Sequence, residues 1–434
     1  MILYSCLSIV FWAGINERVT SLLVLRLYPE ASSALLSFFF SIAPMAAVCT
    51  ALASPLVEKS GKKNVMVPLY LTSLCFAFLL PFVPALKGPL GGAATVAVLA
   101  VILCCFHASR AIGISGWFPL INDNVPDEMR GRFFGKLRTS WQTVLILMTA
   151  ATGLFFGDAP ELWRFQTTYA IALIGVMAST FVIMTIPEAP LSASGKDNSF
   201  WKLLSIPFGN KVFVNFLIFG AVYSLALGLA GPFAIRCLKH TLHAGDGFVV
   251  WLETLSGIGA ACTLPVWGWF VDRFGNKAIF ALLLPPLAIS NLFWLMLSPD
   301  FAWWREVVGI CSVLQGICAF GNSVGVTDMM LGGAAKESRS AYINLCFMLN
   351  TVTCGIAPYL GAVISNMVGD WSIVWGVFTI DSNRAVFLFR AFLLLLPLFF
   401  LSKLSRKHGG HLGVAFQDMG ESLASLLGRR KNDD

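Results

Sequence analysis

The fold of this chain is decided by two charged stretches, Ser54-Pro-Leu-Val-Glu-Lys-Ser-Gly-Lys-Lys63 and Gly268-Trp-Phe-Val-Asp-Arg-Phe-Gly-Asn-Lys277. Each follows a long apolar run and holds an acid, a base, a spacer, a glycine and at least one further base. Their acids stand at positions 58 and 272, which are 214 residues apart (272 − 58) in a chain of 434 residues. The same polar turn at the same place in each half predicts two structural repeats.

The composition is that of a membrane protein. The chain is 57% hydrophobic and 12% charged, and its mean hydropathy is +0.77. A soluble protein of this length could not cover so much apolar surface with so few charges. The first residues, Met1-Ile-Leu-Tyr4, run straight into an apolar stretch without a basic leader or a small-residue cleavage site. We interpret that stretch as the first span and not as a cleavable signal.

Polar residues divide the chain into about twelve apolar segments, each long enough to cross a hydrocarbon core of about 30 Å. Glycine and proline inside them do not argue against helices, because membrane helices tolerate both. The sequence therefore predicts an all-α integral membrane protein. The predicted spans are 3–26, 34–57, 65–86, 93–121, 138–156, 166–187, 211–235, 246–270, 278–297, 306–332, 342–366 and 385–402.

The basic residues predict the orientation. If both termini are cytoplasmic, most of the 30 lysines and arginines fall in inner loops and in the tail, as the positive-inside rule requires. The net charge of +7 is then an orientation signal, and no nucleic-acid partner is implied. Because the loops are short, we expect a multi-pass protein of a bacterial plasma (inner) membrane.

A second pair of similar stretches, one in each half, supports the prediction of two repeats. Pro126-Asp-Glu-Met-Arg-Gly-Arg132 resembles Ala334-Ala-Lys-Glu-Ser-Arg-Ser340, and the main polar interruption lies between these two stretches. The predicted organisation is a six-helix bundle over 1–187, a cytoplasmic linker over 188–210, a second six-helix bundle over 211–402 and a cytoplasmic tail over 403–434.

With about twelve spans and charged hairpins after spans two and eight, the chain resembles the major facilitator superfamily. The pattern of that family is glycine, three residues, an acid, a base, a spacer, glycine and two bases. The second copy matches it except at Asn276, whereas the first has Ser54 for glycine and Glu58 for aspartate. The resemblance implies two pseudo-symmetric six-helix bundles, and a secondary active transporter that moves a small organic solute by alternating access.

The hairpins are predicted to form a gate. A small residue lets two helices approach closely, and a carboxylate can lie at a helix N-terminus beside a guanidinium. Such a cluster would hold the inner gate in one state and release it in another. A tight turn with lysines that only set the orientation is the alternative. The predicted gate residues are Glu58, Lys59, Gly61, Lys62, Gly268, Asp272, Arg273, Gly275, Arg130 and Arg339.

Asn16-Glu17-Arg18 places charge inside the first predicted span. A carboxylate facing hydrocarbon is costly, so this part of the helix should line an aqueous cavity or pair with another helix. The functional interpretation is that Glu17 and Asn16 contact the substrate or that Glu17 carries a proton. The alternative is a packed contact in which Arg18 extends toward the surface with Glu17 as its partner.

Arg110 lies in the fourth span and shares a helix face with His107. A buried arginine needs a carboxylate or an anionic ligand, and Glu17 is one candidate partner. Members of the resembled family often carry an arginine here, followed by glutamine and glycine. In that family the arginine has been linked to proton coupling. Gly113 and Ile114 replace the pair here, so the match to the family's pattern is limited to the arginine, and Arg110 and His107 are candidates for substrate or coupling-ion contact.

Other polar residues in the spans are candidates for binding a solute or for joining helices. Arg390 is interpreted as a side chain that extends to the membrane surface. The further candidates for substrate or coupling-ion contact are Gln142, Tyr223, Glu253, Asn322 and Asn350.

These residues favour a transporter over an enzyme, since the chain has no HExxH, no GxSxG and no loop long enough for a catalytic domain. The cysteines lack metal-ligand spacing, and neither a metal nor a cofactor is expected. We expect a monomeric proton symporter in the lipid bilayer, with Glu17 as the titrating group and a small-molecule substrate. An uncoupled facilitator and a transport-inactive sensor or scaffold are the alternatives. Arg110 would indicate an anionic or zwitterionic solute unless it pairs with Glu17.

Overall fold

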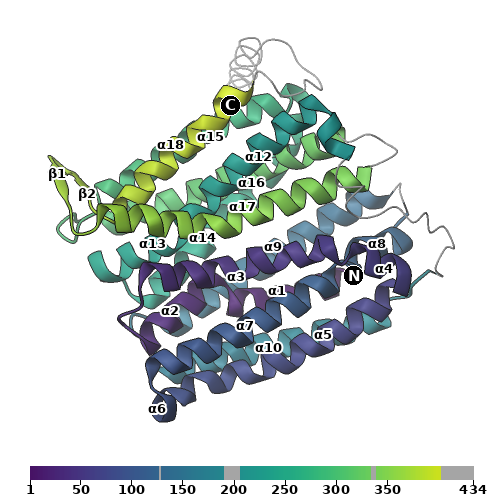
Figure 1. The fold of residues 1–434 in the computed structure, drawn as a ribbon, viewed down its shortest axis with the longest axis horizontal. Helices are drawn as coiled ribbons and strands as arrows, with labels where there is room; N and C mark the ends of the chain where they lie inside the picture. Colours follow the sequence, from purple (N-terminus) through teal and green to yellow (C-terminus); the bar gives the residue numbers. More distant parts are fainter. Residues whose placement is uncertain (127–128, 190–205, 334–338, 402–434) are drawn as a thin grey trace, which may run out of the picture.

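The computed structural model describes residues 1–126, 129–189, 206–333 and 339–401, and these are almost entirely helical (Figure 1). The elements of the first half are α1 (Ile2–Ile15), α2 (Glu17–Leu27), α3 (Ser33–Leu52), α4 (Ser54–Ser60), α5 (Lys62–Leu79), η1 (Leu80–Leu86), α6 (Lys87–Leu90), α7 (Gly92–Ile114), α8 (Trp117–Asn124), α9 (Arg130–Phe156) and α10 (Leu162–Thr185).

The second half continues with η3 (Ile206–Gly209), α12 (Lys211–Leu229), α13 (Gly231–Arg236), η4 (Cys237–Thr241), α14 (Asp246–Phe274), α15 (Asn276–Leu292), η5 (Phe293–Leu295), α16 (Trp304–Gly333), α17 (Arg339–Val368), β1 (Ile373–Trp375), β2 (Phe378–Ile380) and α18 (Arg384–Phe400). The strands form an antiparallel hairpin in which Val374 pairs with Thr379. The described residues are thus mostly helical, as predicted, and this short hairpin lies in the connection between α17 and α18.

The predicted number of membrane crossings is confirmed. Within the described residues, 11 helical segments are long and apolar enough to cross a membrane. Helix α18, with 17 described residues, adds a twelfth at the predicted place. Six of these crossings precede the stretch 190–205 and six follow it, as expected for two six-helix bundles.

The first crossing differs from its prediction. The sequence predicted one continuous helix over 3–26, but the backbone of Asn16 is extended (φ −66°, ψ 165°) and separates α1 from α2. The Asn16 side chain accepts a hydrogen bond from the Val19 amide at 2.9 Å and so caps the second helix. The break places Glu17 in the first turn of α2, where a carboxylate is favoured by the helix dipole.

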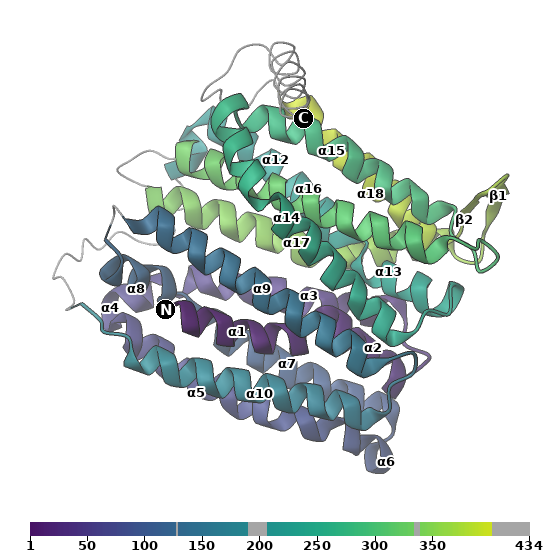
Figure 2. The same ribbon diagram turned by 180° about the vertical axis from the view of Figure 1, so that it is seen from behind.

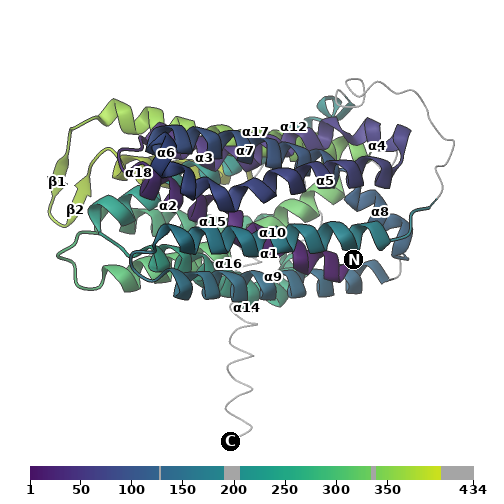
Figure 3. The same cartoon turned by 90° about the horizontal axis from the view of Figure 1, so that it is seen from below.

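The bundle has two distinct ends. The N-terminus, α4 and α8 lie at one end, and the strands β1 and β2 lie at the other (Figures 1 and 3). We call the first the basic end, since it holds Lys62 and Arg273, and the second the β-hairpin end.

Two pairs of long helices make the most extensive contacts between the halves among the described residues. Helix α3 packs against α17, and α9 packs against α14, which run side by side in Figure 2. One apolar core includes buried residues of both halves, such as Leu23, Leu238 and Val249. The other three described cores each belong to one half, and those around Tyr70 and Phe274 lie toward the basic end. Among the described residues, the shared core therefore lies toward the β-hairpin end.

Candidate functional site

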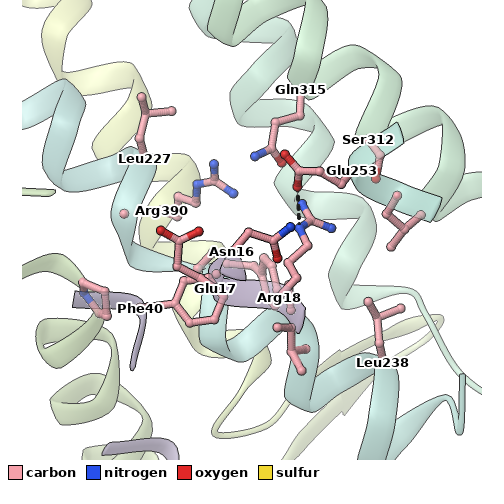
Figure 4. Close-up of a pocket in the computed structure, with 18 of the residues that line it drawn as sticks. Asn16, Glu17, Arg18, Phe40, Leu227, Leu238, Glu253, Ser312, Gln315 and Arg390 are labelled. Carbon is pink, nitrogen blue, oxygen red and sulfur yellow. Dashed lines mark ion pairs between the residues drawn. The ribbon is translucent and has the colours of Figure 1, made fainter. Parts of the chain in front are cut away.

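A cavity of about 270 Å³ lies between the two halves (Figure 4). It contains the break between α1 and α2 on one side and the broken crossing of α12 and α13 on the other. Its walls are supplied by Asn16, Glu17, Arg18, Phe40, Pro44, Leu227, Gly228, Ala230, Gly231, Ala234, Ile235, Leu238, Leu252, Glu253, Trp294, Ser312, Gln315, Cys354, Pro358, Phe387 and Arg390. Of the predicted site residues, Asn16, Glu17 and Glu253 are thus brought together.

An ion pair crosses the cavity from one half to the other. Arg18 Nε lies 2.7 Å from Glu253 Oε2, so that α2 is connected to α14 (Figure 4). Arg18 Nη1 also donates to the Val249 carbonyl at 3.5 Å. The sequence suggested Glu17 as the partner of Arg18, and the structure instead uses Glu253.

Arg390 is buried in the cavity wall. Its side chain is 5% exposed, which contradicts the expectation that it extends to the membrane surface. Its Nε donates to the Ala226 carbonyl at 2.9 Å, and its Nη1 donates to Asn291 Oδ1 at 3.1 Å. Its Nη2 has no hydrogen-bond partner among the described residues. A buried guanidinium is therefore held by neutral acceptors, with one nitrogen left for another group.

Glu17 is half-buried, and among the described residues no ion pair joins it to an arginine or a lysine. In Figure 4 its carboxylate extends into the space between Arg390 and Asn16. The cavity thus contains one paired set of charges, Arg18 with Glu253, and two charges outside that pair, Glu17 and Arg390.

Arg110 lies outside this cavity, in the first half. It is 6% exposed, and its Nη2 donates to Ser8 and Ser179 at 3.3 Å each. The guanidinium also stacks on the rings of Phe11 and Tyr70, 4.5 Å and 4.1 Å from their centroids. Glu17 was one candidate partner, and no ion pair between the two is found among the described residues. Aromatic faces and hydroxyls stabilise the charge instead.

The remaining candidates also lie outside the cavity wall. His107 packs against Trp12, with their rings 5.9 Å apart. Gln142 donates to the Gly257 carbonyl at 3.1 Å and so joins α9 to α14 across the halves. Tyr223 and Asn322 are buried in the second half, and Asn350 Nδ2 lies 3.5 Å from Cys346 Sγ. The contact of Gln142 is of the kind that the alternative interpretation describes, in which polar side chains connect helices.

Sequence reasoning missed several residues of the wall. Ser312 and Gln315 come from α16, and Trp294 comes from the short helix η5. Gln315 interrupts a long apolar run, and that signal could have identified it. Trp294 carried no such signal, because 13 tryptophans are spread over the chain.

The two charged hairpins are tight turns at the basic end. Gly61 (φ +93°) and Gly275 (φ +80°) each join two helices in a conformation that favours glycine. The Lys62 ammonium pairs with Asp123, and the amides of Lys62 and Lys63 donate to the Glu188 carboxylate at 2.6 and 3.3 Å.

The second turn repeats this arrangement with a neutral residue. Asn276 Nδ2 donates to Asp328 Oδ2 at 3.0 Å. Lys59, Asp272 and Arg273 are exposed. The predicted close approach at Gly268 is not found, since a Cβ there would meet no atom within 4 Å. The side chains of Glu58, Arg130 and Arg339 lie outside the described part of the structure.

Within the described residues, no group of three or more histidine, cysteine or acidic side chains could hold a metal ion.

Comparisons with known proteins agree with this architecture. Residues 221–413 match the model of a family described as Major Facilitator Superfamily. No curated protein sequence matches the chain. The fold is similar to that of the nucleoside transporter NupG, at 14% identity and a TM-score of 0.67, over 94% of this chain and 98% of that chain.

Two further solved structures are similar. The D-xylose-proton symporter has 13% identity and a TM-score of 0.69, over 94% of this chain and 98% of that chain. The inward open conformation of the xylose transporter XylE from E. coli has 12% identity and a TM-score of 0.68, over 95% of this chain and 97% of that chain. At such identities the likeness is one of fold.

Proposed function

We propose that the chain is a member of the major facilitator superfamily and a secondary transporter that moves a small polar solute across the membrane by alternating access. The observation that carries this proposal is the cavity, whose wall comes from both halves and holds Glu17, Arg18, Glu253 and Arg390. A site between two repeats can face each side of the membrane in turn when one repeat rocks against the other.

The orientation and the state of the molecule follow from its two ends. The excess of lysine and arginine supports a cytoplasmic basic end, with both termini inside and the chain in the plasma membrane. The two halves share an apolar core toward the β-hairpin end, and their cores at the basic end are separate. This conformation is therefore assigned as the one in which the site faces the cytoplasm. Because one chain completes the cavity, we take the monomer as the working unit.

The coupling ion in this proposal is a proton carried by Glu17. A carboxylate without an ion partner among the described residues, on the wall of the cavity, is placed to exchange a proton as access alternates. An uncoupled facilitator would use the same cavity without this step.

The proposal is tested with the full chain in vesicles. A panel of small polar solutes is offered as counterflow substrates, with and without an inward-directed pH gradient. We expect a solute to exchange, and a pH gradient to drive its accumulation in the wild type but not in Glu17→Gln. Exchange without accumulation in the wild type would identify a facilitator. If a folded protein moved no solute in any gradient, the transport proposal would be abandoned in favour of a sensor.

A further inference from the structure

We propose that the transported solute carries a carboxylate, which binds Arg390, and that it binds together with the proton on Glu17. This inference names the substrate class of the cavity and rests on the proposed transport function. Neither the sugar nor the nucleoside in the names of the similar structures belongs to this class.

The first step concerns the charge of Arg390. A guanidinium buried at 5% exposure normally needs an anionic partner. No ion pair with an acid is found among the described residues. Its two hydrogen bonds go to a carbonyl and to an amide oxygen, and its Nη2 has no partner there. Since this residue forms part of the cavity wall, the missing anion can come from a ligand.

The second step concerns how Arg390 is held. The Ala226 carbonyl and Asn291 fix the guanidinium from two different helices, α12 and α15. Its Nη2, together with the remaining proton of Nη1, leaves an edge that matches the two oxygens of a carboxylate. The walls contributed by Phe40, Trp294 and Phe387 are apolar. The cavity of about 270 Å³ limits the solute to a small organic acid.

The third step concerns the other charges. The charged groups of the cavity wall are Glu17 and Arg18 from α2, Glu253 from α14 and Arg390 from α18, and Cys354 of α17 is its one thiol. Arg18 and Glu253 neutralise each other at 2.7 Å. An arriving carboxylate therefore adds a second negative charge to a site that already holds Glu17. Like charges repel strongly away from water, and a proton on Glu17 removes that repulsion.

The experiment measures ligand-induced thermal stabilisation of the purified full chain, at pH 5.5 and pH 7.5. The probes are a panel of small carboxylic acids, each matched with its amide, and a panel of amino acids. In the wild type, we expect at least one acid to bind about tenfold more tightly at the lower pH, and its amide not to bind. Glu17→Gln imitates the protonated carboxyl, so it should bind that acid at pH 7.5 as tightly as the wild type does at pH 5.5.

The arginine is tested in parallel with two variants. Arg390→Gln should lose binding of the acid more than tenfold, and Arg390→Lys should keep part of it because the charge remains. If Arg390→Gln fails to fold, the lysine variant and Glu17→Gln decide the question.

Three outcomes would overturn the inference: amides that bind as well as their acids, no acid that binds, or amino-acid binding that Glu17→Gln abolishes. The last outcome would identify a zwitterionic solute whose ammonium contacts the ionised Glu17. Proton-driven transport of a neutral solute would refute this inference and leave the transport proposal intact. A complete absence of transport would remove both.

Discussion

The two ends of the interface between the halves are built in different ways. At the β-hairpin end the contact involves the backbone, since the Gly247 amide donates to the Gly157 carbonyl at 2.6 Å and the Asp246 amide donates to the Asp158 carbonyl at 3.0 Å. At the basic end the ion pair between Lys62 and Asp123 lies within one half.

This difference indicates which contacts between the halves must break for the cavity to open to the other side of the membrane. Close backbone packing between glycines leaves no room for water and depends on small residues at both positions. Charged side chains near water exchange one partner for another at a small cost. The conspicuous hairpins of the sequence thus lie where the halves are apart, and the inconspicuous Gly153, Gly157 and Gly247 lie where they meet.

The largest effect is expected from Gly247→Leu. A Cβ at this position would lie 2.4 Å from the Gly153 carbonyl oxygen and 2.8 Å from the Gly157 carbonyl oxygen, so α9 and α14 would have to separate. Such overpacking should destabilise this conformation by about 2 kcal/mol. Spin labels attached in place of Trp163 and Trp303 should lie farther apart in this variant than in the wild type. The rate of transport should fall more than tenfold. Gly88→Ala, in open space, serves as the control. Unchanged distances would show that the glycine contact does not hold this end closed.

The matched change at the other end is Gly268→Leu. Its Cβ meets no atom within 4 Å, so this conformation should keep its stability and its distances. Transport should still fall, because the larger side chain obstructs closure of the basic end. A variant that transports normally would show that no helix approaches Gly268 in any state of the cycle.

An intermediate effect is expected at the ion pair between Arg18 and Glu253. The two side chains are 26% and 35% exposed, which limits their coupling to about 1 kcal/mol. Arg18→Ala and Glu253→Ala should each slow transport severalfold. A double-mutant cycle on thermal unfolding measures the coupling, and the exchanged pair Arg18→Glu with Glu253→Arg should recover part of the stability. Additive single effects would show that the pair does not connect the halves.

The smallest effect is expected from making the two hairpins alike. Asn276→Lys would give the second turn the lysine that Lys62 supplies to the first, opposite Asp328 where the first has Asp123. Since Asp328 would give the new ammonium a carboxylate partner, as Asp123 does for Lys62, we expect only a small change in the free energy of unfolding. Transport should stay within twofold. A large loss of stability would mean that the buried amide of Asn276 has a packing role that a lysine cannot fill.

The sequence by itself determined the architecture. Hydropathy, the duplicated turns at Gly61 and Gly275 and the distribution of basic residues predicted the crossings and the two bundles, because each depends on residues close together in the chain. The sequence also identified Glu17, Asn16 and Glu253, since charges in apolar runs are rare enough to notice.

Only the tertiary structure decided which of those charges meet. The sequence offered Glu17 as a partner for Arg110, but Arg110 stacks on Phe11 and Tyr70. Arg18 pairs with Glu253, which is more than 200 residues away in the chain. Arg390 is a similar case, since the sequence predicted a side chain at the membrane surface and the structure places it in the cavity wall. Pairing depends on which helix faces pack together across the halves. That packing is fixed by the shape of the whole bundle, and no local pattern in the chain records it.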